Sequence, residues 1–488
     1  MIRPLIRYPA VRSGLASPEV ETMHKKGETM HKKTVDTVIF NGDIFTGDRS
    51  QPHYRPGAIA ISDGVVVGIG REQEILSVYD ATRRIDAQGA LVHPGFIETH
   101  FHSTGTAYHG APFSPQSGTA SKVNYSSMKA ATDPEITAAY TAAAACSMLQ
   151  RGFTLYFESA TVFETDAFAE TLTKCGVRGM VTAPWGWDDM SSDMNDGYGL
   201  NETLMRRAPA DARRVIDQCK HELARNKDDN ALVRGYVGLC GGTTATDELV
   251  REAVRLATES NVIFWQHQAF EPEGDAEERR KFGDSGTARM YRLGALGPNT
   301  TLAHMNMLDE QDVELILAMK PGLSWCPNNA MGYRITPPHK CWFPHLYRKG
   351  ASVSLGVDTI MIHPIGIAGL MSLYLSRLVG DRMNDSDPFY MQTIDAARNV
   401  GLGDRLGSLT VGKRADVVIR EARDITHYSW RDDMGILLSL SSSMIPVDTI
   451  LIDGKVVMEK GRLTTMDQDE ILAEAVRQRD LLADRLSA

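Results

Sequence analysis

The middle of the chain contains eight short apolar runs, and each is closed by polar or turn-forming residues. Between residues 93 and 405 the runs end at GFIETHFH, FTLYFES, RGMVTAP, VRGYVGLCG, NVIFWQHQ, TLAHMN, GLSWCPN and ASVSLGVD. Helical patterns separate them, so the segment alternates strand with helix. This alternation predicts an α/β fold of the (β/α)8 TIM-like barrel type, which needs about 250 residues or more.

The two ends of the chain have a different pattern, in which short alternating runs are closed by Gly, Asn and Asp. VDTVIFNGDIFTG and GAIAISDGVVVGIG precede the middle segment, and GSLTVGKRADVVI and VDTILIDGKVVMEKGRLT follow it. Such runs predict strands joined by tight turns. We therefore expect residues 34–92 and 406–465 to form one small composite β-sandwich domain, followed by an amphipathic helix over 466–488.

The first 33 residues carry a tandem copy, ETMHKK-G-ETMHKK, and no continuous apolar core of the signal-peptide type. We expect residues 1–33 to be a disordered tail. A transit peptide is the alternative, because Arg3, Arg7 and Arg12 precede the first acidic residue, Glu19.

Composition excludes several classes of protein. Acidic residues outnumber basic ones by 62 to 52, which argues against binding to nucleic acid or to an anionic membrane surface. No run approaches the roughly 18 apolar residues of a membrane span. The six cysteines form no CxxC pair, which fits reduced thiols in a cytoplasmic protein. We expect a cytoplasmic enzyme with a small-molecule substrate.

A set of metal-ligand residues stands at the ends of four of the apolar runs. His100 and His102 lie two residues apart, so on a strand both imidazoles face the same side. His267, His304 and Asp358 close three later runs. Imidazoles with one carboxylate suit zinc, with iron, cobalt or manganese as alternatives, and leave a position open for water. We expect one divalent ion per chain.

The combination of these motifs resembles the amidohydrolase superfamily, in the branch that holds cytosine and guanine deaminases and triazine-degrading hydrolases. The resemblance rests on PGFIETHFH, TLAHMNMLDEQDVELI, CPNNAMG, VSLGVD and LGSLTVGKRADVVI, and it extends from about residue 35 to the end. It implies one metal held by His100, His102, His267 and Asp358, with His304 as a further ligand or as a partner of water and substrate. It also implies a homo-oligomer, a dimer or larger.

The resemblance implies catalytic roles for Asp358 and His304, but it leaves one acid unassigned. In the deaminase branch a glutamate follows the fifth-strand histidine by three residues and passes a proton to the ring nitrogen. Here that position is Phe270, and the nearest acid is Glu271. Glu271 can replace the missing acid only if the backbone turns sharply after His267, and a solvated loop role is the alternative. His304, His339 or Asp358 alone could also carry the proton.

Aromatic and amide side chains follow several of the predicted strands, and they are candidates for the pocket wall. Flat rings and apolar groups are commonly enclosed by such side chains, although core packing and turn roles are equally compatible with the sequence. The candidate substrate-binding residues are Tyr108, His109, Phe113, Trp185, Trp187, Trp325, Asn328, Asn329 and His339. His363, just after Asp358, is expected to belong to a loop.

The predicted function is hydrolysis of a C–N bond by metal-activated water. The substrate is expected to be a small aromatic or heterocyclic amine, amide, urea or carbamate, which includes xenobiotic compounds. The first alternative is displacement of chloride or a thioalkyl group from a heteroaromatic ring. A remote alternative is a non-catalytic binding relative, which usually lacks some of the metal ligands that are all present here.

Overall fold

The computed structural model describes most of the chain. The described residues are 32–103, 125–191, 202–332, 340–358, 365–421, 437, 441 and 445–487. The prediction of a disordered tail falls almost entirely on residues 1–31, which lie outside this set. Five of the sequence candidates lie outside it as well: Tyr108, His109, Phe113, His339 and His363.

The middle of the chain forms parallel strands at all eight predicted runs. Two parallel sheets have the orders β6-β7-β8-β9 and β10-β11-β12-β13-β14. Their strands are β6 (Phe96–Phe101), β7 (Phe153–Glu158), β8 (Arg178–Val181), β9 (Val233–Gly235), β10 (Val237–Gly241), β11 (Phe264–Gln268), β12 (Thr300–His304), β13 (Gly322–Trp325) and β14 (Ser352–Leu355). A parallel bridge between Phe101 and Asp358 connects the end of β6 to the chain after β14.

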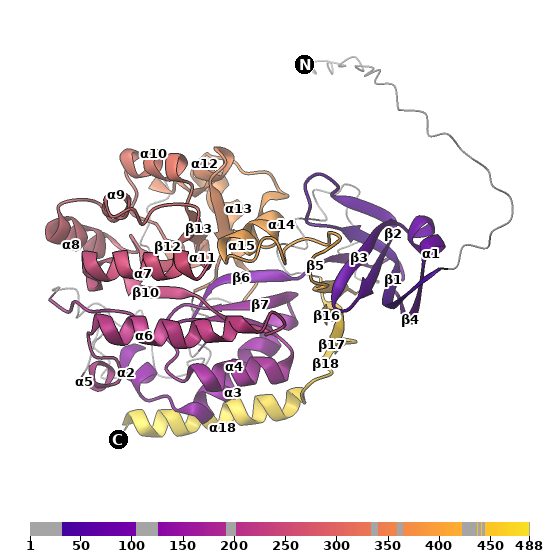
Figure 1. Ribbon diagram of the computed structural model, residues 1–488, viewed down its shortest axis with the longest axis horizontal. Helices are drawn as coiled ribbons and strands as arrows, with labels where there is room; N and C mark the ends of the chain where they lie inside the picture. The colour runs from indigo at the N-terminus through magenta and orange to yellow at the C-terminus, as the bar shows by residue number, and fades with distance from the viewer. Residues whose placement is uncertain are drawn as a thin grey trace, which may run out of the picture.

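Helices connect these strands, and Figure 1 shows them on the outside of the two sheets. Apolar residues on their inner faces and on the strands form the largest core cluster. The helices are α2 (Tyr125–Ala130), α3 (Pro134–Leu149), α4 (Thr165–Cys175), α5 (Glu202–Arg207), α6 (Ala212–Leu223), α7 (Asp247–Glu259), α8 (Pro272–Phe282), α9 (Gly286–Arg292), α10 (Glu310–Met319), α11 (Pro327–Gly332), α12 (Phe343–Arg348), α13 (Ala368–Leu378), α14 (Asp387–Met391) and α15 (Ile394–Asn399). Short 3₁₀ helices cover Ala224–Lys227 and Gly242–Thr244.

One nine-stranded sheet combines strands from both ends of the chain, at the right of Figure 1. Its order is β18-β17-β16-β15-β5-β1-β2-β3, with β4 paired to β1. The strands are β1 (Lys33–Phe45), β2 (His53–Ser62), β3 (Val65–Arg71), β4 (Tyr79–Asp86), β5 (Leu91–Pro94), β15 (Val417–Arg420), β16 (Val447–Ile452), β17 (Lys455–Glu459) and β18 (Arg462–Leu463), with the short helix α1 (Glu72–Val78). Antiparallel pairing of β5 with β15 joins the two ends. The division into domains stays a prediction.

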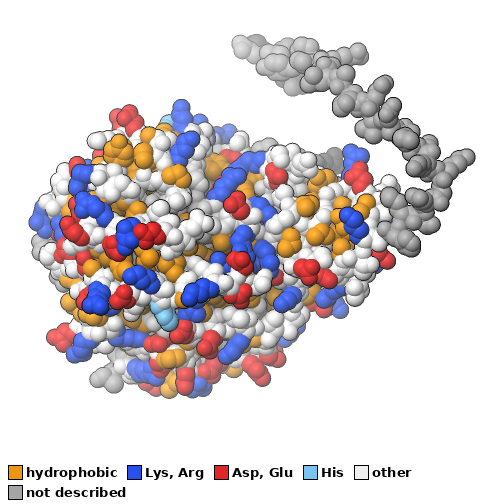
Figure 2. Space-filling model, viewed as in Figure 1, with side chains coloured by type: hydrophobic (Ala, Val, Ile, Leu, Met, Phe, Trp, Pro, Cys, Tyr) orange, Lys and Arg blue, Asp and Glu red, His pale blue; other side chains and the backbone are white. Residues whose placement is uncertain are grey.

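The last helix, α18 (Gln468–Ser487), lies along α3 on the α/β part of the molecule. None of the helices in the described part of the chain is long and apolar enough to cross a membrane. On the face drawn in Figure 2 basic and acidic side chains are interspersed rather than segregated by sign. This mixture agrees with the modest net charge of −10.

Candidate metal centre

Four histidines and one aspartate come together at the carboxyl ends of β6, β11, β12 and β14. The His100 ring centroid lies 5.0 Å from that of His267 and 4.6 Å from that of His304, and His102 lies 5.5 Å from His267. Oδ1 of Asp358 is 3.4 Å from Nε2 of His100 and 3.2 Å from Nε2 of His102. The structure thus brings all five predicted ligand residues into one cluster.

The backbone holds this cluster through the contact between β6 and the end of β14. The Asp358 amide donates to the His100 carbonyl at 2.7 Å, and the His102 amide donates to the Asp358 carbonyl at 3.1 Å. Gly356 permits the close approach, because a Cβ there would lie 2.6 Å from the Cβ of His100. Asp358 and His304 have φ values of 63° and 73°. Non-glycine residues in this region are uncommon and concentrate at functional sites.

Glu98 ties the two strand ends together from inside the protein. Its Oε1 accepts the amide of His100 at 3.1 Å and the amide of Val357 at 2.9 Å. Burial raises the pKa of Glu98 to about 8, with the nearby Asp358 charge adding to the shift. The carboxyl group therefore holds the backbone of His100 and of Val357, the residue before Asp358.

The hydrogen bonds of the imidazoles direct their remaining nitrogens toward the centre. Nδ1 of His267 must donate to the Cys240 carbonyl, 2.5 Å away, because a carbonyl only accepts. Nδ1 of His100 contacts Ser159 Oγ at 3.1 Å, and Nδ1 of His102 contacts Thr161 Oγ1 at 2.8 Å. Nε2 of His100 is buried and has no hydrogen-bond partner among the described residues beyond the nearby Asp358 carboxylate. Such an arrangement leaves Nε2 for a metal.

Burial keeps the imidazoles of His102, His267 and His304 in the neutral form that binds metals. It lowers the pKa of His304 to about 3, and the other histidines add to the shift. Burial also places the pKa of His267 well below the ordinary value and lowers that of His102. For Asp358 burial opposes ionisation, but contacts with His100 and His102 outweigh it, so its pKa lies well below the ordinary value. Neutral imidazoles beside an ionised carboxylate fit a divalent ion of the zinc type.

Comparison with known proteins identifies the family. The model of the amidohydrolase family matches residues 91–457. The chain belongs to the amidohydrolase family. It is accordingly a metal-dependent hydrolase that acts on carbon–nitrogen bonds.

Two relatives of this amidohydrolase are deaminases by name. A 5-methylthioadenosine/S-adenosylhomocysteine deaminase of Symbiobacterium thermophilum is 27% identical over 89% of this chain and 96% of its own length. A 5'-deoxyadenosine deaminase of Methanobrevibacter smithii is 23% identical over 86% and 92%.

Solved structures of low sequence identity share the fold. An adenosine deaminase of Xanthomonas campestris with bound zinc has a TM-score of 0.81 at 21% identity and covers 93% of this chain and 99% of its own. A zinc complex of an atrazine chlorohydrolase of Arthrobacter aurescens has a TM-score of 0.76 at 18% identity, covering 91% and 100%. These neighbours have TIM-barrel-type folds, in agreement with the α/β content described above.

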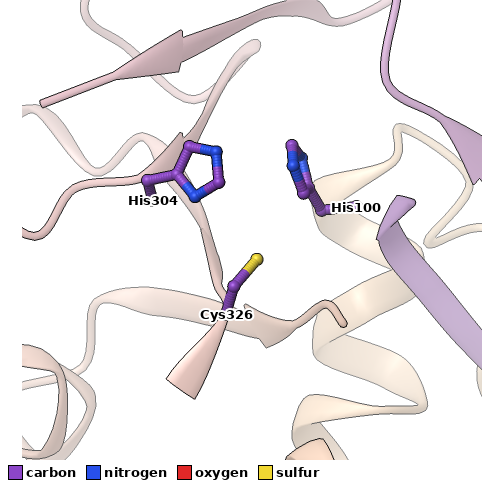
Figure 3. A group of neighbouring side chains, drawn as sticks. All are labelled: His100, His304 and Cys326. Carbon is purple, nitrogen blue, oxygen red and sulfur yellow. The ribbon is translucent and has the colours of Figure 1, made fainter. Parts of the chain in front are cut away.

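Cys326 is a member of the cluster that the sequence analysis missed. Figure 3 shows it with His100 and His304, and the potential ligand atoms of these three residues lie within 4.8 Å of one another. A second set with the same spacing consists of His100, His102 and His267. His304 therefore groups with the thiol rather than with the other two histidines. The position of Cys326, one residue after β13, was a signal that could have identified it.

Phe270 occupies the neighbourhood in which the family pattern places an acid. Its ring lies 4.4 Å from that of His304. The backbone does turn after His267, since Ala269 has φ 49° and Glu271 directly precedes α8. Glu271 lines a small cavity together with His267 and Phe270, and burial raises its pKa. Its catalytic role stays a prediction.

The three tryptophan candidates for the pocket wall are packed in the interior. Trp185 and Trp187 lie 5.1 Å apart in a small core cluster, and Trp187 donates to the Ala208 carbonyl. Trp325 stacks on Phe343 of α12 at 4.9 Å. These contacts correspond to the core-packing alternative. Trp265, which the sequence analysis did not select, stacks on His100 at 5.4 Å; its spacing of two residues from His267 places both on one face of β11.

Asn328 reaches the cluster from α11. Its Nδ2 donates to the Val357 carbonyl at 3.3 Å, beside Asp358. Its Oδ1 is buried and has no partner among the described residues. An acceptor oriented in this way can receive an N–H group from a ligand. The side chain of Asn329 lies outside the described part of the structure.

Proposed function

We propose that this amidohydrolase cleaves a small aromatic or heterocyclic amide, urea or carbamate at a single zinc ion, with Asp358 carrying the proton. The observation that carries the proposal is the cluster of histidines around Asp358, in a chain of this family. His100, His102, His267 and Asp358 would hold the ion. Iron, cobalt and manganese are the alternatives that the same donor set accepts.

A bound ion of this type supplies an acidified water near neutral pH and polarises the bond that is attacked. Asp358 lies against both His100 and His102 and is the base that accepts the proton of the attacking water. It then delivers this proton to the leaving nitrogen, so a single carboxylate performs both transfers. His304 is neutral and lies beside His100. It is placed to donate a hydrogen bond to the reacting group or to accept one from it.

The surroundings of His304 favour an acyclic C–N bond over a ring amine. Deamination of a ring requires protonation of a ring nitrogen, and the family pattern uses the position of Phe270 for that acid. A phenyl ring cannot donate a proton. Phe270 and Trp265 instead offer apolar surface to a flat substrate, while Asn328 Oδ1 offers an acceptor for an N–H group. Amides, ureas and carbamates carry N–H groups of this kind.

The remaining parts of the proposal concern the whole chain. We propose that the two parallel sheets form one closed (β/α)8 barrel, supported by the Phe101–Asp358 bridge and by the direct succession of β9 and β10. We propose that the nine-stranded sheet is a composite domain of both chain ends. A cytoplasmic location, a role toward xenobiotic compounds and a homo-oligomeric state stay predictions.

A product screen with the zinc-loaded protein tests the reaction. Amides, ureas and carbamates that carry an aryl group on nitrogen are compared with heteroaromatic amines at equal concentration. Released amine or ammonia is measured. The proposal expects an aryl amine from the first group and little ammonia from the second. Ammonia from ring amines as the dominant product would contradict it. Asp358→Asn, loaded in parallel, controls for hydrolysis outside this site.

Hydrolytic displacement of chloride or a thioalkyl group is the second candidate. The atrazine chlorohydrolase among the structural neighbours is the observation that favours it. The same screen then includes chloro- and thioalkyl-triazines, and the product is halide or thiol instead of amine. Release of halide without amine would select this candidate.

A further inference from the structure

We propose that Glu158, Thr161 and Lys129 are positioning residues of the metal site, which hold His102 in the tautomer that presents Nε2 to the ion. This inference rests on the proposed metal site and adds three residues to it. The three side chains come from β7, the loop after it and α2. They are buried, with exposures of 1% for Glu158, 3% for Thr161 and 0% for Lys129.

The hydroxyl of Thr161 has a fully determined set of hydrogen bonds. A hydroxyl carries one proton and two lone pairs. Lys129 Nζ lies 2.7 Å from Oγ1 and can only donate. Oγ1 donates its own proton to Glu158 Oε1 at 2.8 Å. The remaining lone pair faces Nδ1 of His102 at 2.8 Å, so the hydroxyl accepts from Nδ1–H and favours the tautomer with an unprotonated Nε2. The Asp358 carboxylate, 3.2 Å from Nε2, favours the other tautomer and competes with this hydrogen bond.

Glu158 is the residue that sets the direction of this chain. Besides the Thr161 hydroxyl, it accepts the amides of Ser103 at 2.8 Å and Thr161 at 3.2 Å. All of these groups donate, and the Lys129 ammonium adds an opposite charge, so the carboxylate is stabilised as an acceptor. The hydroxyl proton of Thr161 is therefore drawn toward Glu158 and away from His102.

The three metal-facing histidines are oriented by acceptors of different strength. His267 donates to a main-chain carbonyl, which never donates in return. His100 contacts the Ser159 hydroxyl, which also accepts the Phe101 amide. His102 contacts a hydroxyl that can donate or accept, and Glu158 and Lys129 set the direction of that hydrogen bond while Asp358 faces Nε2. The tautomer of His102 is accordingly the one that side-chain substitutions at a distance can change.

Nuclear magnetic resonance of ¹⁵N-histidine in the metal-free protein reads the tautomer directly. Wild type is expected to show His102 protonated on Nδ1. Glu158→Gln offers Thr161 an amide that donates as well as accepts, so a fraction of the Nε2–H tautomer is expected to appear. Thr161→Val removes the acceptor altogether and is expected to do the same. Thr161→Ser keeps the hydroxyl and is the matched control, expected to behave as wild type.

Zinc affinity, measured by competition with a chromophoric chelator, provides the second readout. Loss of an outer partner of a ligating histidine typically weakens metal binding about 10–100-fold, and this range is expected for Glu158→Gln and Thr161→Val. The visible spectra of the cobalt-loaded Glu158→Gln and Thr161→Val variants are also expected to differ from that of wild type. Circular dichroism melts verify that each variant is folded; if Thr161→Val is not, Glu158→Gln decides alone.

An unchanged His102 tautomer and a zinc affinity within twofold of wild type in Glu158→Gln would overturn the proposal. Failure of the proposed reaction has a different signature. In that case the wild-type protein binds zinc and shows the Nδ1–H tautomer but releases no product in the screen.

Discussion

The ends of β6 and β11 both deliver histidines to the same centre, but they are built differently. At β6 two buried carboxyl groups, Glu98 and Glu158, hold the backbone and a histidine partner. At β11 His267 donates to the main-chain carbonyl of Cys240, and the ring of Phe270 lies 4.4 Å from that of His304. The acids of this region lie elsewhere, with Glu271 before α8 and Glu278 on α8, hydrogen-bonded by Gln268.

The difference separates metal binding from proton delivery. The residues that would hold an ion are complete at both strand ends, whereas the proton donor of the deaminase pattern is missing only at β11. Gln268 and His267 are neighbours on a strand, so their side chains point to opposite faces. Glu278 is therefore hydrogen-bonded to a side chain that points away from His267, and it lines the small cavity that His267, Phe270 and Glu271 also line.

The largest effect is expected from Asp358→Asn, which removes the carboxylate that lies against both β6 histidines. Loss of a general base typically lowers the rate about 100- to 10,000-fold. Steady-state kcat on the best substrate of the screen, with metal content measured on the same samples, tests this. A variant that retains zinc and more than a tenth of the wild-type kcat would exclude Asp358 as the proton carrier.

Phe270→Glu is expected to make the β11 end more like that of the deaminase relatives. A carboxylate beside His304 can protonate a ring nitrogen, so release of ammonia from heteroaromatic amines should increase roughly tenfold. Phe270→Gln is the control, because glutamine is polar and about as large as glutamate but has no carboxyl group. Equal ammonia release by the two variants would show that the missing acid does not limit ring deamination.

Glu278→Gln tests the acid behind β11 through stability. Burial raises the pKa of Glu278 to about 7, from 4.5 in an unfolded chain. Between these values the folded state holds the proton and the unfolded chain has released it, so stability falls as the pH rises from 4.5 to 7. Glu278→Gln cannot lose stability in this way. The free energy of unfolding of the variant minus that of wild type should therefore increase by about 1.4 kcal/mol per pH unit in that window.

Urea unfolding at pH 5, 6 and 7 measures this gain. Glu273→Gln, an exposed position on the same helix, is the matched control for the loss of a carboxylate from α8. A constant difference between Glu278→Gln and wild type across the three pH values would mean that Glu278 titrates as an ordinary carboxyl group.

The smallest effect is expected from Glu271→Gln. Glu271 precedes α8 but makes no side-chain capping hydrogen bond, so the substitution should leave the helix intact. With Asp358 carrying the proton, kcat should stay within about threefold of wild type, below the 100-fold loss typical of a general acid. A loss of tenfold or more, with normal zinc content, would restore Glu271 as the displaced acid.

The sequence by itself determined the strands and the residues of the candidate metal cluster. Period-two spacing of His100 and His102 and the polar closure of each apolar run place ligands at strand ends, and strand ends of parallel sheets meet on one side. Phe270 was also visible in the sequence as a departure from the family pattern. These features are local, so the chain order of the residues was enough to find them.

Only the tertiary structure decided which side chains surround the ligands. Thr161, in the loop after β7, contacts His102, and Glu158 and Lys129 contact Thr161 in turn. Cys326 lies beside His100 although the two are 226 positions apart in the sequence. Trp325 was a reasonable wall residue by sequence, yet it packs on α12. Contacts of this kind depend on how strands and helices pack against each other, and a one-dimensional pattern does not contain that information.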